Sequence, residues 1–142
     1  MSYTHQNRRA SRHLAGESKK PPLRVNFDRR LKLEFHGSRI TSDAGLLAYR
    51  ELDDALGLTK IAEDVFQDSR TGKNGCHGMT GQFRQSLFGR VGGYEDVNDA
   101  ERLGRDPTMR WIVGGKAVER QAASTSQMGR FETELLATDA NI

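Results

Sequence analysis

The spacing of hydrophobic residues changes near residue 42, and this change divides the chain into two regions. Before residue 42, apolar side chains recur at intervals of two, which is typical of a strand with one buried face. These side chains are Val25, Phe27, Leu31, Leu33 and Phe35. A turn at residues 36–38 and a second strand at residues 39–41 would complete a small β-hairpin. A lone hairpin has little stability, so we expect it to pack against the rest of the chain.

From residue 42 onward, apolar positions recur every three or four residues, as in amphipathic helices. We expect the first helix to bury a stripe made of Ala48, Tyr49, Leu52, Ala55 and Leu56. The inner faces of the next three helices would carry Leu58, Ile61, Ala62 and Val65, then Met79, Phe83, Leu87 and Val91, then Tyr94, Val97, Ala100 and Leu103. Two further helices would bury Met109, Trp111, Ile112 and Val113, and Met128, Phe131 and Leu135.

Several short signals mark where these helices begin and end. Gly57 is expected to end the first helix, because glycine readily takes the left-handed conformation found after a helix. Asp106 followed by Pro107 predicts the start of the fifth helix. Ser124 and Gln127 have the spacing of a capping box, which predicts the start of the sixth.

These patterns predict a mainly α fold, in which a small N-terminal β-hairpin is followed by five or six short helices. We expect three parts: a disordered basic arm at residues 1–23, a helical domain at residues 24–137 and a tail at residues 138–142.

Charge is distributed unevenly between the two regions. Residues 1–40 contain ten Lys or Arg and three acids, a net of +7, whereas residues 41–142 contain twelve and sixteen, a net of −4. A basic arm suits contact with a polyanion such as DNA, because each cation placed on a phosphate releases a condensed counterion. The candidate contacts in the arm are Arg8, Arg9, Arg12, Lys19 and Lys20. The alternative interpretation is a solvated, disordered tail.

Composition excludes several classes of protein. A single cysteine, Cys76, rules out an internal disulfide and a zinc site built on several thiolates. No apolar run approaches the roughly 20 residues of a membrane-spanning helix. The first thirty residues are charged and lack the apolar core of a secretory signal. The sequence therefore predicts a cytoplasmic protein without a membrane partner.

The acidic residues occur in clusters, as metal ligands often do. The clusters are Asp53 with Asp54, Glu63 with Asp64, Asp96 with Asp99, and Glu132 with Glu134. Two-metal phosphoryl transfer needs carboxylates that converge on the ions. These acids instead fall on the predicted polar faces or at helix starts, where they favour the helix dipole. We interpret them as solvated or capping residues, with Asp53 and Asp54 facing solvent, and assign no catalytic or metal-binding residue.

Five arginines recur through the third to fifth predicted helices. They are Arg84, Arg90, Arg102, Arg105 and Arg110. Two interpretations stay open, because arginine forms ion pairs with neighbouring acids and also anchors phosphates bidentately. We take Arg84 and Arg90 as candidate DNA contacts. On an exposed face, Arg84 and Gln85 could also contact base edges.

Four segments in a fixed order carry a family resemblance. They read TSDAGLLAYRELD (residues 41–53), FRQSLFGR (83–90), GYEDVNDAERLGRDP (93–107) and QAASTSQMGRFE (121–132). Together they resemble the N-terminal region of bacterial insertion-sequence DDE transposases, group 1 type, whose catalytic core has an RNase H-like fold. The resemblance runs from about residue 25 to the end of the chain.

This resemblance implies a function in DNA transposition. In such proteins a helical N-terminal domain helps to bind the terminal inverted repeats of the element. A catalytic domain then holds Mg²⁺ through two Asp and one Glu, which we expect beyond residue 142. The resemblance therefore implies a truncated transposase that is inactive alone, needs no cofactor itself, and has DNA and another transposase subunit as partners.

Two alternatives remain: a free-standing small helical DNA-binding regulator, and a protein–protein (multimerisation) module. If the chain is truncated, we expect part of the apolar surface of the last two helices to be left uncovered. That surface comprises Trp111, Ile112, Val113, Phe131, Leu135 and Leu136.

Overall fold

The protein is mainly helical, as the sequence predicts. The computed structural model describes residues 23–33, 43–70 and 76–141. Within these ranges it contains α1 (Leu46–Leu56), α2 (Leu58–Val65), α3 (Met79–Val91), α4 (Ala100–Leu103), α5 (Pro107–Val113) and α6 (Thr125–Arg130). Two 3₁₀ turns, η1 (Val97–Asp99) and η2 (Gly115–Ala117), and a π-helical turn, η3 (Phe131–Leu136), lie between or after them. Two very short strands, β1 (Leu23–Arg24) and β2 (Lys32–Leu33), precede the helices.

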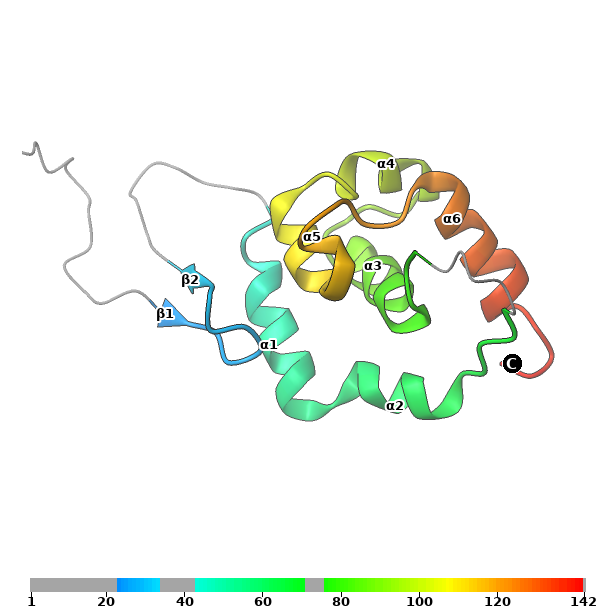
Figure 1. Ribbon diagram of the computed structural model, residues 1–142, viewed down its shortest axis with the longest axis horizontal. Coiled ribbons are helices and arrows are strands. Elements are labelled where there is room, and N and C mark those ends of the chain that lie inside the picture. The colour runs from blue at the N-terminus through cyan, green and yellow to red at the C-terminus, as the bar shows by residue number, and fades with distance from the viewer. Residues whose placement is uncertain (1–22, 34–42, 71–75, 142) are drawn as a thin grey trace, which may run out of the picture.

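Helix α3 lies at the centre of the helical body (Figure 1). It packs on α5, and the C-terminal α6 and η3 lie on another side of the body. Helices α1 and α2 meet at an angle and follow the outside of the body, where α1 contacts α5 and α2 contacts α3. The β1–β2 pair projects beside α1.

The core consists of two adjoining clusters of buried side chains. The larger contains Leu46, Leu47, Phe88, Leu103, Met109, Ile112, Val113, Ala117 and Ala122. The smaller contains Ala100, Ala123, Met128, Phe131 and Leu135. The apolar surface of the last two helices thus lies inside the body: Ile112 is 0% exposed and Phe131 is 2% exposed. The expectation that this surface is left uncovered was wrong, because it packs on α3 and on the smaller helices around it.

The N-terminal hairpin predicted from residues 25–41 is not supported. The predicted first strand is interrupted by a turn, in which the Leu31 N–H donates to the Asp28 carbonyl at 3.1 Å. Within the described residues, a two-residue antiparallel ladder pairs Leu23 with Leu33 on either side of this turn. Asp28 favours a turn by accepting the Arg30 N–H with its side chain, a local signal that the alternating apolar pattern obscured. The predicted turn and second strand lie outside the described residues.

The predicted inner stripes of the first three helices also need correction. In α1, the predicted stripe is exposed, with Tyr49 at 57% and Leu52 at 51%, while Arg50 and Asp53 are buried. In α2, the predicted apolar stripe is likewise exposed. In α3, the predicted stripe is half right, because Met79 and Phe83 pack against the smaller cluster while Leu87 and Val91 are exposed. The buried positions of α3 are Gln82, Gln85, Ser86, Phe88 and Gly89. These helices orient polar side chains inward because the side chains form hydrogen bonds there, which the apolar periodicity does not report.

The predicted helix boundaries are largely confirmed. Gly57 has φ of 68°, a left-handed conformation that separates α1 from α2. Asp106 caps α5 by accepting the Met109 N–H at 2.8 Å, and Pro107 occupies the first turn. The capping box of α6 is present, with the Ser124 N–H donating to Gln127 Oε1 at 2.9 Å.

Gly104, after α4, lies where two chain segments approach closely. A Cβ added there would lie 2.9 Å from the Ala100 carbonyl oxygen and 3.4 Å from those of Ala122 and Ala123. The same approach allows the Ala122 N–H to donate to the Gly104 carbonyl at 2.8 Å. Residue 104 must therefore be glycine for the 121–124 segment to reach the core.

We predict that Gly104→Ala destabilises the protein by about 1–3 kcal/mol, because the methyl group would displace backbone atoms. The matched control is Gly129→Ala in α6, where an added Cβ meets nothing within 4 Å. This control should be neutral or stabilising by up to about 1 kcal/mol, because alanine is the better helix former. Urea denaturation of both variants tests the prediction, and equal effects at the two positions would contradict it.

Candidate nucleic-acid interface

A basic segment before α1 is anchored firmly to that helix. The backbone N–H groups of Asn26 and Phe27 both donate to Glu51 Oε2, at 2.7 and 3.1 Å. Val25 is buried, at 4% exposure. The Phe27 ring lies 4.9 Å from the guanidinium of Arg50, a cation–π contact. The 23–33 segment therefore has a defined position on the body.

The cations of this basic segment face solvent. It contains Arg24, Arg29, Arg30 and Lys32, all exposed, against the single acid Asp28. The Arg30 guanidinium forms a 2.7 Å ion pair with Asp28, and hydrogen bonds from Arg30 lower the pKa of that carboxyl. The same guanidinium lies 4.8 Å from the Trp111 ring of α5. The positive charge predicted for the arm thus continues into a folded, exposed turn.

The arginines of the helical body are engaged with partners inside the protein. Arg90 pairs with Glu132 at 3.0 Å, Arg102 with Asp99 at 3.9 Å and Arg105 with Glu101 at 2.5 Å. Arg110 donates to the carbonyls of Ala117 and Val118. The ion-pair interpretation of these side chains therefore describes the structure, although Arg90, Arg102 and Arg105 keep more than half of their side-chain surface exposed.

Arg84 belongs to a buried polar network at the junction of α1, α2 and α3. The Asp53 carboxylate accepts the Thr59 N–H at 2.7 Å and the Thr59 hydroxyl at 2.8 Å, so it caps the start of α2. Arg50 Nη1 lies 3.4 Å from Asp53 Oδ2, and Arg84 Nε lies 3.8 Å from the same oxygen. Burial and the nearby Arg50 lower the pKa of Arg84. The prediction that Asp53 faces solvent was wrong, whereas Asp54 is exposed as predicted.

The role considered for Gln85 in contacting bases is also not supported by its position. Gln85 is 3% exposed. Its amide nitrogen donates to the Ala123 carbonyl at 2.7 Å, and its oxygen accepts the Ala123 N–H at 2.8 Å. Through these two hydrogen bonds, Gln85 holds the extended segment before α6 against α3. From its position in the sequence alone, a glutamine that contacts bases cannot be distinguished from one that holds a neighbouring segment of the chain.

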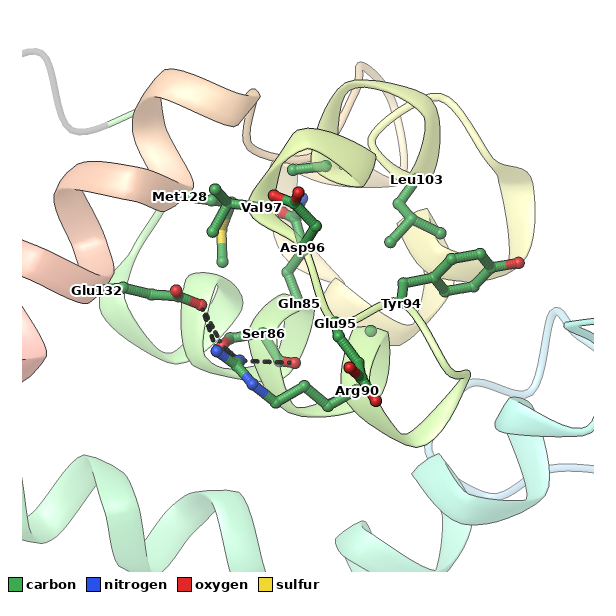
Figure 2. Close-up of a pocket in the computed structure, with 12 residues that line it drawn as sticks. Gln85, Ser86, Arg90, Tyr94, Glu95, Asp96, Val97, Leu103, Met128 and Glu132 are labelled. Atoms are coloured by element: carbon green, nitrogen blue, oxygen red, sulfur yellow. Dashed lines mark hydrogen bonds and ion pairs between the residues drawn. The ribbon is translucent and has the colours of Figure 1, made fainter.

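A small cavity lies beside this contact, between α3, the 94–97 segment and η3 (Figure 2). Ser86 donates its hydroxyl to Glu132 Oε1 at 2.8 Å, and Arg90 contacts both of these residues. The volume of about 20 Å³ suits a single water molecule. The hydrogen bonds of Ser86 and Arg90 to Glu132 join α3 to η3. The cavity beside them is too small for a substrate.

Two further acids, Asp96 and Asp43, serve the scaffold in a similar way. Asp96 accepts the Asn98 N–H at 2.9 Å, which caps η1 and lowers the pKa of the Asp96 carboxyl. Asp43 accepts the Tyr94 hydroxyl at 3.1 Å and so connects the 94–97 segment to the start of α1. In the part of the chain that the structure describes, no three His, Cys, Asp or Glu side chains gather as a metal site.

These observations define a small helical domain with an anchored basic segment on its first helix. The chain belongs to the family described as transposase DDE domain group 1, whose model matches residues 23–142. Searches of curated proteins and of solved structures gave no match. Membership confirms the resemblance and indicates a function related to transposition.

Two properties of the family can be compared with the described residues. DDE transposases generally use Mg²⁺, which requires converging carboxylates. The carboxylates described above are bound to backbone N–H groups, hydroxyls or guanidinium groups, and they do not fit such a site. Separately, among the described helices none is both long and apolar enough to cross a membrane.

The Asp53 network yields a stability prediction. Asp53→Asn keeps an acceptor for the Thr59 N–H but removes the negative charge beside Arg50 and Arg84. We expect a loss of about 2–4 kcal/mol, because cations that are largely removed from water would lose their counter-charge. The control is Asp54→Asn, whose side chain is 53% exposed and lies 3.6 Å from Arg50. This control should change stability by less than about 0.5 kcal/mol. Equal denaturation midpoints for the two variants would disprove the proposed role of Asp53.

Proposed function

We propose that this chain is the N-terminal, DNA-associated part of an insertion-sequence transposase, and that it binds the terminal inverted repeats of its element. The observation that carries this proposal is the anchored basic segment at residues 23–33, in a chain that belongs to a transposase family. The DNA contacts would be mainly electrostatic, from the cations that precede α1.

The charge distribution supports this location for the contacts. Arg29 and Lys32 are exposed on the basic segment, whose backbone is positioned by its hydrogen bonds to Glu51. Fixing the backbone in advance lowers the entropy lost on binding. Arg8, Arg9, Arg12, Lys19 and Lys20 would extend the same contact, although they lie outside the described residues. Arg84 is a weaker candidate than the sequence indicated, because its guanidinium is directed to Thr59 and Asp53.

In this proposal, residues 24–137 contribute to DNA binding and do not cleave a strand. Three of the clustered acids have structural partners. Asp53 caps α2, Asp96 caps η1 and Glu132 binds Ser86. We therefore expect purified protein to show no nicking with Mg²⁺ or Mn²⁺. Reproducible metal-dependent nicking that is lost in Asp96→Ala would contradict this expectation.

Salt dependence of DNA binding tests the location of the contacts. For a duplex carrying the inverted repeat, the logarithm of the association constant should fall linearly with the logarithm of the salt concentration. The slope should be about −0.9 per neutralised phosphate. The double variant Arg29→Ala with Lys32→Ala should flatten this slope by about 2. Deletion of residues 1–22 should flatten it further.

The charge-matched control is Lys60→Ala with Arg105→Ala, which removes two exposed cations from the helical body. It should leave the slope unchanged. If the control flattens the slope as much as the double variant does, the contacts lie on the body and the proposed interface is wrong.

A further inference from the structure

A turn with two exposed cations follows α5, at residues 114–120. The cations are Lys116 and Arg120. The backbone of this turn is held from inside the body, because Arg110 Nε donates to the Ala117 carbonyl at 2.9 Å. Ala117 itself is 1% exposed and belongs to the larger core cluster. The two cations therefore project from a backbone whose position is set by the core.

This turn lies beside the basic segment at residues 23–33, although the two are far apart in the sequence. The Arg30 guanidinium is 4.8 Å from the ring of Trp111, which belongs to α5 just before the turn. Two apolar side chains of the basic segment pack, like Trp111, against the larger core cluster. The pKa of Arg30 is raised chiefly by Asp28, and Glu119 of the turn lies close enough to add to this effect. The cations before α1 and those after α5 therefore border on one another.

The cations of this combined surface differ in their pairing from the arginines elsewhere on the body. The exposed arginines of the 90–105 region form ion pairs with acids, as described above. Among the described residues, no such pair involves Arg29, Lys32, Lys116 or Arg120. The acids within the surface, Asp28 and Glu119, both lie near Arg30 and offset chiefly its charge. The surface therefore presents positive charge to a partner.

The aromatic ring in this surface indicates which part of a nucleic acid the surface suits. Proteins that bind single strands stack the bases on exposed aromatic side chains. Trp111 is instead partly buried against the core, and Arg30 lies over its ring. The ring is thus covered rather than offered to a base. The exposed Lys and Arg side chains around it suit the phosphate groups of a duplex, which such side chains contact without reading the sequence.

We propose that Lys116 and Arg120 form a second phosphate-contact site, which continues the DNA-binding surface of the basic segment across Trp111. This inference rests on the proposed function, and it adds contacts from a part of the chain that the charge pattern of the sequence does not single out. Both segments are held against one core cluster, so a duplex could contact both with little loss of conformational entropy in the protein.

The salt dependence of binding to the inverted-repeat duplex tests this second site. Lys116→Ala with Arg120→Ala should flatten the slope by about 2, because two phosphates would no longer be neutralised. A duplex of the same length and scrambled sequence should show the same change, because phosphate contacts carry no sequence information. The matched control is again Lys60→Ala with Arg105→Ala, which removes the same charge from other exposed positions and should leave the slope unchanged.

Acrylamide quenching of Trp111, the single tryptophan of the chain, is a second measurement that needs no variant. A bound duplex should cover the surroundings of the ring and lower the quenching constant. The second site is wrong if this constant does not change, or if the Lys116 and Arg120 variant keeps the wild-type slope. In either case the proposed function still holds, provided that Arg29→Ala with Lys32→Ala flattens the slope. If neither double variant flattens the slope, or the control flattens it equally, both proposals are wrong.

Discussion

The arrangement of the first three helices depends on one carboxylate. Asp53 lies in α1, caps α2 through Thr59, and provides the negative charge near which Arg50 and Arg84 lie. Because Arg50 also donates to the Ile112 carbonyl, the same group of side chains reaches α5. A buried ion pair contributes little net stability compared with apolar packing, but it is costly to break and can specify one arrangement. Here it determines which side of α1 and α2 faces the body.

The difference between local and long-range contacts explains where prediction from sequence succeeded and where it failed. Helix boundaries follow local chemistry, so Gly57, Asp106 and the Ser124–Gln127 pair were interpreted correctly. The orientation of α1 follows a contact between residues 50 and 112, which no local pattern contains. The turn at Asp28–Leu31 was missed because its apolar neighbours happen to alternate. The engagement of Gln85 with Ala123 was missed because it joins segments 38 residues apart.

The segments that carry the family resemblance turn out to build the scaffold. In the third segment, Asp96 caps η1, Gly104 allows close approach and Asp106 caps α5. In the second segment, Gln85 binds Ala123 near the beginning of the 121–132 segment, and Ser86 binds Glu132 at the end of that segment. The resemblance therefore rests on residues that have structural roles in this chain. It identifies the family without locating a reactive group in the described residues.

The anchoring of the basic segment has a consequence for the position of its charge. Two backbone N–H groups donate to one oxygen of Glu51, Val25 is buried, and Phe27 and Leu31 pack against the larger core cluster. Separating the segment from the body would therefore expose apolar surface as well as break two hydrogen bonds, so the segment should open together with the core and not before it. The cations of the segment thus keep their position for as long as the helical body is folded.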